Sequence, residues 1–528
     1  MSLILSQIKR ALYNWSRPEM SENSSHVDNN KSCGTDDITN DYYKYFVNSF
    51  SVKDSSWKGE KQTLDCLEKI MKTVDKHAFT VVKGYVQSGK SQLMIYYSAW
   101  VAHQHNMNIV IMLRNQTADI KSLSDKFRKF KNEKGIKNLE IINFAKYYNA
   151  MEFEDVVDKF NETKKVFIIL GNSDQLSKLN KVTKNNKITP FVMCIDEFDL
   201  NDKIETSKFQ KEFELLKTSG NIAHILGVTG TALPIMFKHV SKLTSEQIIS
   251  LEAPLMYKGI QNITFTEIDI EKQGIIEETM LKMLKSRYAF YDKDNKKHPS
   301  ILLIKDDRIK TNQIDLMNEL YNNKKIQKNW ALIVYNGDGI FVKLPQNKNI
   351  EIQKNESINS TLQKIKDLYQ ESIKYIAIIS GDLANRGLSF VSTDYSWHLT
   401  HMIMCASNSS TGTNLMQYSR LCGCYNDDIP LEMFTSVDIT HELFAYDNLQ
   451  ERCVEKCEDP LLDVEGLKLR LTKMKLDETC IVRRSIDTKV KAKYDKLSNY
   501  DKIMMGEKLD VNTVKEAIKY VKEELKEK

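Results

Sequence analysis

Glycine and proline are scarce in this 528-residue sequence, and its net charge is small. It contains 19 Gly and 8 Pro beside abundant Lys, Asn and Ile, a bias typical of an AT-rich coding genome such as that of a large DNA virus or a microbe. Nine cysteines form an odd, scattered set with no secretory signal, which argues against a disulfide framework. No apolar run reaches the roughly 18 residues of a membrane span. We therefore expect a cytoplasmic protein without a membrane partner.

The length and the mixed composition predict a large globular protein with several domains. With a formal net charge of +5, the chain permits a polyanionic partner without requiring one. Apolar, strand-like runs alternate with helical patterns over most of its length, which favours an α/β fold with parallel sheets. The pattern predicts a flexible arm (1–58), a first sheet domain (59–245), a connector (246–297), a second sheet domain (298–445) and a helical C-terminal region (446–528).

The segment Gly84–Ser91 matches the phosphate-loop pattern G-x-x-x-x-G-K-[ST], after an apolar run and before a helical pattern. Its two glycines let the backbone amides and the next helix N-terminus face a triphosphate. Lys90 is placed to reach the β- and γ-phosphates, and Ser91 to bind Mg²⁺. The candidate ATP contacts in the loop are Gly84, Gln87, Ser88, Gly89, Lys90 and Ser91.

An acidic pair, Asp196 and Glu197, ends a later apolar run. Hydrolysis of a γ-phosphate depends on charge neutralisation and on a group that orients water, so we expect Asp196 in the Mg²⁺ shell and Glu197 as catalytic base. A further strand ends at Thr229, Gly230 and Thr231, whose small polar groups we expect to couple the hydrolytic carboxylate to the domain cleft.

Polar residues Arg114, Asn115 and Gln116 follow another predicted strand. Groups at this end of a parallel strand project into the ligand-binding crevice, where these three could hold a nucleic-acid backbone. The alternative is a helix cap beside a solvated, charged helix face.

The second half repeats the alternation of strands and helices without another phosphate loop. Its third predicted strand leads into Asn385–Ser389, and its fourth is followed by Asn414–Gly423. An arginine opposite a phosphate loop can stabilise transition-state charge, and Arg420 is our first candidate for this role and Arg386 our second.

In this order the motifs resemble a superfamily 2 helicase or translocase core, and more narrowly the Z-one domain, the ATPase module of restriction endonucleases. The segments that carry the resemblance, over residues 60–455, are Gly84–Ser91, Leu113–Thr117, Ile195–Glu197, Gly227–Ala232, Asn385–Ser389, Met416–Gly423 and Glu442–Arg452. The resemblance implies two tandem RecA-like P-loop-type domains, with ATP and Mg²⁺ as cofactors and ATP hydrolysed in the cleft between the domains.

The resemblance also implies site residues outside the phosphate loop. A glutamine about 22 positions before the loop, here Gln62, reads adenine in helicase-like ATPases, although a lone glutamine is otherwise a surface residue. Gly387 and Gln417 belong to the nucleotide site, and Arg420 is the arginine finger. The chain departs from the family at Ser419, where a glycine is usual, and at Cys424, where no arginine follows Gly423.

We therefore expect a nucleoside triphosphate hydrolase that acts as a nucleic-acid helicase or translocase, with DNA favoured over RNA and contacts through the backbone. A nuclease, replication or restriction protein is the expected partner. Two alternatives stay open: a non-motor regulatory ATPase that acts on a partner protein, and a motor that packages or translocates duplex DNA.

Overall fold

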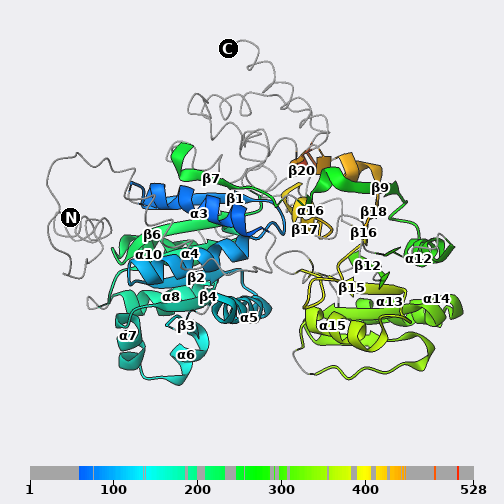
Figure 1. Cartoon of the computed structure of the whole chain (residues 1–528), viewed down its shortest axis with the longest axis horizontal. Helices are drawn as coiled ribbons and strands as arrows, with labels where there is room; N and C mark the ends of the chain where they lie inside the picture. Colours follow the sequence, from blue (N-terminus) through cyan, green and yellow to red (C-terminus); the bar gives the residue numbers. More distant parts are fainter. Residues whose placement is uncertain are drawn as a thin grey trace, which may run out of the picture. The chain divides into compact units, whose positions relative to one another are not determined.

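The computed structural model describes most of the chain between residues 59 and 447. The described residues are 59–74, 76–134, 136, 138–184, 188–198, 208–231, 245–254, 256–285, 290–291, 297–305, 310–353, 356–381, 384, 389–405, 412–424, 429–441, 443–444, 446–447, 481–482 and 508–509. By their packing they form two compact units (Figure 1). The described residues as far as Pro254 form unit 1, except that 86–88 group with unit 2, which otherwise begins after Pro254.

Unit 1 is built on a seven-stranded sheet in the order β3-β4-β2-β5-β6-β1-β7, and every neighbouring pair is parallel. The strands are β1 (Phe79–Gly84), β2 (Asn108–Leu113), β3 (Glu140–Asn143), β4 (Lys165–Leu170), β5 (Phe191–Asp196), β6 (Ile222–Thr229) and β7 (Ile248–Leu251). β2 is buried along its whole length, and β4 and β5 along nearly all of theirs, as parallel strands covered on both faces require. Because β6 separates β1 from β5, the phosphate-loop strand and the acidic-pair strand are not neighbours.

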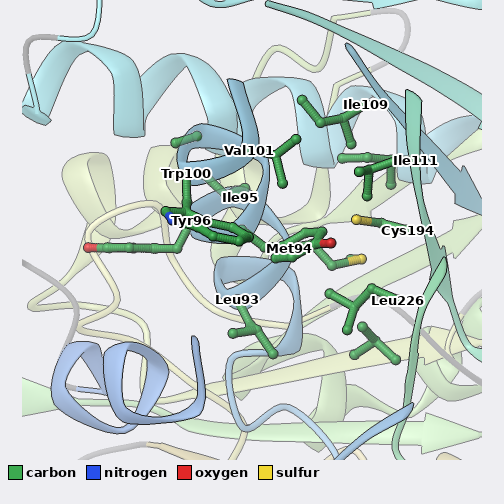
Figure 2. Close-up of a cluster of buried hydrophobic side chains, with 14 of the residues drawn as sticks. Leu93, Met94, Ile95, Tyr96, Trp100, Val101, Ile109, Ile111, Cys194 and Leu226 are labelled. Atoms are coloured by element: carbon green, nitrogen blue, oxygen red, sulfur yellow. The ribbon is translucent and has the colours of Figure 1, made fainter. Parts of the chain in front are cut away.

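Helices cover both faces of this sheet (Figure 1). One core contains side chains of α3 (Glu60–Val74), α4 (Lys90–Gln104) and α5 (Thr117–Lys134). Figure 2 shows part of it, with Met94 of α4 facing Cys194 of β5. The core on the opposite face contains side chains of α6 (Phe144–Ala150), α7 (Phe153–Asn161), α8 (Ser173–Thr183) and α10 (Lys208–Thr218). Side chains alternate along a strand, so the residues next to Cys194 and Leu226 face this second core.

Unit 2 contains a second seven-stranded sheet in the order β14-β13-β15-β12-β16-β18-β9. Its strands are β9 (Ile263–Glu267), β12 (Ser300–Lys305), β13 (Trp330–Asn336), β14 (Gly339–Lys343), β15 (Tyr375–Ser380), β16 (His401–Met404) and β18 (Leu431–Thr435). All neighbours are parallel except the edge hairpin of β13 and β14. Helices α12 (Ile275–Lys285), α13 (Lys310–Asn322) and α14 (Lys324–Asn329) pack on one face. Two further helices are α15 (Ile358–Tyr369) and α16 (Gly412–Tyr418).

Two sheets of this kind confirm the predicted fold class, an α/β chain with two tandem RecA-like parallel sheets. The predicted domain limits stay predictions, although residues 246–297 contain β7 of the first sheet and β9 and α12 of the second unit. The arm at 1–58 and most of the region 446–528 lie outside the described residues. In the latter, β19 (Ile481–Val482) and β20 (Lys508–Leu509) form an antiparallel pair.

Shorter elements complete the described residues. The two-residue strands are β8 (Tyr257–Lys258), paired with β17 (Gly423–Cys424), and β10 (Phe290–Tyr291), paired with β11 (Lys297–His298). Three 3₁₀ turns are η1 (Ser245–Gln247), η2 (Ile260–Asn262) and η3 (Pro345–Asn347). Among the described helices, none combines the length and the apolar character needed to cross a bilayer.

Candidate nucleotide-binding site

The phosphate loop joins the end of β1 at Gly84 to the start of α4 at Lys90. Two of its residues have left-handed backbones, Gln87 with φ 59° and Gly89 with φ 103°. Glycine adopts this conformation without a steric penalty, which accounts for Gly89 directly before the helix. Its carbonyl accepts the first helical hydrogen bonds, from the amides of Gln92 (2.8 Å) and Leu93 (3.1 Å). The first amides of a helix lack acceptors inside the helix, so the start of α4 has the geometry with which helices commonly bind anions.

Side chains of the loop are largely withdrawn from solvent. Lys90 is 9% exposed, and its Nζ donates a hydrogen bond to the Tyr85 carbonyl at 2.7 Å. The buried Ser88 hydroxyl has no hydrogen-bond partner among the described residues. A buried polar group without a partner is costly, and a phosphate oxygen at this position would remove that cost.

The acidic pair lies where β5 ends. Asp196 is the last residue of the strand, and Glu197 follows with φ 48° and is 5% exposed. The Glu197 amide donates to Asp196 Oδ1 at 3.1 Å, which fixes the turn between them.

Asp196 keeps a partly exposed side, yet dense protein around it makes burial the main influence on its pKa. Burial and the Glu197 carboxylate raise the pKa of Asp196 to about 7, whereas the Lys90 ammonium and then the Arg114 guanidinium oppose the rise. Lys90 and Asp196, 106 positions apart in the sequence, therefore lie within electrostatic reach of each other inside unit 1.

Thr229, Gly230 and Thr231 occupy the end of the strand between β1 and β5. Thr229 pairs in register with Lys83, one residue before Gly84, and Val228 pairs with Asp196. Both threonines are fully buried, and the Thr231 amide donates to the Thr229 hydroxyl at 3.0 Å. The sheet thus brings the predicted coupling turn to the edge that carries the phosphate loop and the acidic pair.

Gln62 is the third residue of α3. Its side chain is half-buried, and Oε1 has no hydrogen-bond partner among the described residues. The predicted contact with adenine stays a prediction.

The three predicted nucleic-acid residues differ in where their side chains lie. Arg114 is 7% exposed and forms a two-point ion pair with the buried Asp119, in which Nη2 donates to Oδ1 at 3.1 Å. Asn115 is exposed, and its Oδ1 accepts a hydrogen bond from Asn172 Nδ2 at 2.9 Å. Gln116 is half-buried, and its Oε1 has no partner among the described residues.

Arg114 lies within electrostatic reach of Asp196. Met112 of β2 pairs with Ile195 of β5, so Arg114 and Glu197 each lie two residues beyond paired positions. This inward placement was not predicted from the sequence. The available signal was Asp119, an acidic residue five positions after Arg114.

In unit 2, Gln417 lies in α16 and Arg420 in the turn that follows it. Both are buried, at 1% and 2% exposure, and Arg420 Nη1 donates to the Gln417 carbonyl at 3.4 Å. Gln87, which groups with this unit, donates from Nε2 to the Arg420 carbonyl at 2.8 Å. Arg386 and Gly387 lie outside the described residues.

No known protein family matches the sequence. A search of curated proteins also finds no similar sequence. Many solved structures do match, and the three described here share 9 to 14% sequence identity with this chain. One is Mss116p with its N-terminal extension and C-tail deleted, bound to single-stranded RNA and AMP-PNP: TM-score 0.46, 13% identity, covering 81% of this chain and 80% of that one.

Two further matches are similar in extent. Dbp5 of S. cerevisiae, bound to RNA and ADP–BeF₃, gives a TM-score of 0.45 at 9% identity, covering 81% of this chain and 95% of that one. A DEAD box protein of Methanococcus jannaschii gives 0.39 at 14% identity, covering 74% of this chain and 90% of that one.

Proposed function

We propose that this chain is an ATPase of the superfamily 2 helicase or translocase type. The observation that carries the proposal is that the strands ending at Lys83–Gly84 and at Asp196 flank β6 in parallel, so that Lys90 lies within electrostatic reach of Asp196 and its neighbour Glu197. A phosphate-binding lysine near a pair of carboxylates, one of them buried, is an arrangement suited to phosphoryl transfer to water. We also propose, from the sequence resemblance, that this ATPase is of the Z-one type.

In this proposal the amides at the start of α4 and the Lys90 ammonium bind the β- and γ-phosphates. Glu197 orients the attacking water and accepts its proton, while Thr229, Gly230 and Thr231 relay the state of the site along β6. Gln62 contacts adenine. Arg420, with Arg386 and Gly387 as further candidates, stabilises the charge that develops on the γ-phosphate.

The residues present fit a magnesium ion. No three His, Cys, Asp or Glu side chains converge in the described part of the chain, so a cage made only of protein is not expected there. Mg²⁺ commonly takes one or two protein oxygens and completes its shell with phosphates and water. Asp196 and Ser91 would supply those oxygens, and the ion would neutralise phosphate charge.

Nucleic acid is the proposed partner, with DNA favoured over RNA as before, and Asn115 and Gln116 at the contact. One observation favours the rival, a regulatory ATPase acting on a protein: the positive member of the predicted triplet, Arg114, is buried against Asp119 and not presented to a phosphate backbone.

A single assay separates these functions. ATP hydrolysis is measured alone and with single-stranded and duplex DNA and RNA, for the wild type, Lys90→Ala and Glu197→Gln. The proposal expects hydrolysis that nucleic acid stimulates and that both variants lose. Hydrolysis insensitive to all four nucleic acids would favour the regulatory ATPase, and stimulation by duplex DNA alone a duplex motor. Absence of hydrolysis would refute the proposal.

A further inference from the structure

Glu197 has a backbone conformation that a glutamate rarely adopts. Its φ of 48° lies in the left-handed region, which costs a residue with a side chain on the order of 1 kcal/mol. Such a conformation persists only where surrounding contacts impose it. The hydrogen bond that the Glu197 amide donates to Asp196 Oδ1 is one such contact, but it lies on the strand side of the turn. The residue on the other side is Phe198.

Phe198 folds back over the sheet. Asp196 pairs with Val228, so an extended chain would carry Phe198 to the level of Gly230. Its ring lies instead on Gly227, three residues earlier on β6. The side chain is 4% exposed, and its ring also packs against Phe79 of β1 at a centroid distance of 5.3 Å. The left-handed turn at Glu197 makes this reversal.

Gly227 is what allows the ring to lie there. Leu226 points towards α4 (Figure 2), so Gly227 faces the opposite core, which contains Phe198. A Cβ added at Gly227 would lie 2.9 Å from Phe198 Cγ and 3.2 and 3.3 Å from the two Cδ atoms. Cγ is one bond from the Phe198 Cβ, so the ring can yield only by leaving its χ1 rotamer within a packed core or by moving its own backbone, which adjoins Glu197.

We propose that Phe198 and Gly227 are positioning residues for Glu197. The ring is seated on β6 and β1, the strands that carry the coupling turn and the phosphate loop, and it holds Glu197 in the left-handed turn that aims its carboxylate. The inference rests on the proposed function, since it assigns Glu197 as the catalytic base. Phe198, the next residue in the chain, holds this base in place. Because its ring lies on Gly227, a shift of β6 would move Glu197 through the ring.

The test compares Gly227→Ala, Phe198→Ala and the double variant in steady-state ATP hydrolysis. A misplacement of about 1 Å can cost a reaction about 100-fold, so each single variant is expected to lower kcat at least about tenfold with little change in KM. The double variant should lose no more than Phe198→Ala, because without the ring the three atoms nearest to the added methyl are gone. Losses that multiply, or an unchanged kcat for Gly227→Ala, would overturn the proposal.

Two controls address folding. Val157 of α7 lies in the same core, and Val157→Ala creates a cavity there. This variant should keep kcat near that of the wild type. Should Gly227→Ala fail to fold, Phe198→Leu replaces it: loss of the flat ring is expected to lower kcat while melting stays cooperative, and a normal kcat would count against the role of the ring.

A crystal structure of Gly227→Ala, or of Phe198→Leu in its place, gives a readout independent of activity. The proposal expects Glu197 to leave the left-handed region, and a φ that stays near 48° contradicts it. A wild type that hydrolyses no ATP refutes the proposed function, while this structure still decides whether Phe198 and Gly227 hold Glu197.

Discussion

The Lys90 ammonium donates a hydrogen bond to the Tyr85 carbonyl, 2.7 Å away across the phosphate loop. The lysine therefore bonds to a neutral acceptor of its own loop. A triphosphate would replace that acceptor with charged oxygens, which form hydrogen bonds roughly twice as strong.

This relationship predicts the effect of Lys90→Ala. Loss of the ammonium should weaken ATP binding by about tenfold or more, equivalent to about 1.4 kcal/mol, and should abolish measurable hydrolysis. Titration with a fluorescent ATP analogue checks the affinity. Lys121→Ala, an exposed lysine on α5, is the matched control and should bind as the wild type does. Equal affinities for the two variants would remove Lys90 from the site.

Glu197→Gln should separate binding from hydrolysis. The amide keeps the size of the side chain but cannot accept the proton of the attacking water, so kcat should fall by roughly 10²–10⁴. Affinity for ATP should stay within about twofold, since the proposed phosphate contacts lie elsewhere. Single-turnover hydrolysis and nucleotide titration measure the two quantities. Glu214→Gln on the exposed face of α10 should change neither, and a Glu197→Gln variant that hydrolyses normally would exclude this residue as the base.

Asp196 should make the free protein less stable as the pH rises. Its pKa is raised from the ordinary value of 3.8 to about 7, so between these values the folded state binds more protons than the unfolded state. The free energy of unfolding therefore falls as the pH rises through that window, and the whole loss is present above pH 7.

Asp196→Asn removes this titration. Relative to the wild type, the variant should gain at least about 2 °C in Tm between pH 5 and pH 8. Melting curves without nucleotide at several pH values measure the difference. Asp155→Asn, an exposed change on α7, should show no such trend, and a Tm difference for Asp196→Asn that is constant with pH would disprove the assigned pKa.

Arg114 and Asn115 should respond differently to substitution. Arg114→Met leaves the buried Asp119 carboxylate without its partner, which should lower the free energy of unfolding by about 3 kcal/mol. Replacing both partners, as Arg114→Met with Asp119→Leu, should restore much of that loss.

Asn115→Ala should cost less than about 0.5 kcal/mol because the side chain is exposed. Any effect of this variant should appear as lower stimulation of hydrolysis by nucleic acid. Urea unfolding measures the stabilities. A full loss of stability in the double variant would show that Arg114 acts through contacts other than Asp119.

Local sequence patterns predicted the two sheets because each pattern has a local physical cause. Runs such as those at β2 and β15 are long enough for a strand and apolar at nearly every position, as expected of a strand buried on both faces. The phosphate loop was visible because Gly89 and Lys90 are adjacent in the chain and need no distant partner to be recognised. The order of the strands could not be read in the same way, since register depends on pairing between segments far apart.

The site shows the same division. Residue types alone indicated Lys90, Asp196 and Glu197, because phosphate chemistry restricts which side chains can serve. Arg114 followed a strand and carried the right charge for nucleic acid, yet it lies buried against Asp119. Only tertiary packing decides whether a side chain at a strand end faces solvent or the protein.

The sequence by itself determined the class of the fold and the chemistry on offer: parallel α/β sheets, a phosphate loop and a carboxylate pair. These follow from local periodicity and from side-chain chemistry, which neighbours in the chain are enough to establish. Tertiary structure decided that β6 lies between β1 and β5, that Arg114 turns inward, and that Phe198 lies on Gly227 behind Glu197. Each of these depends on which distant backbone comes to lie alongside, and no local pattern carries that information.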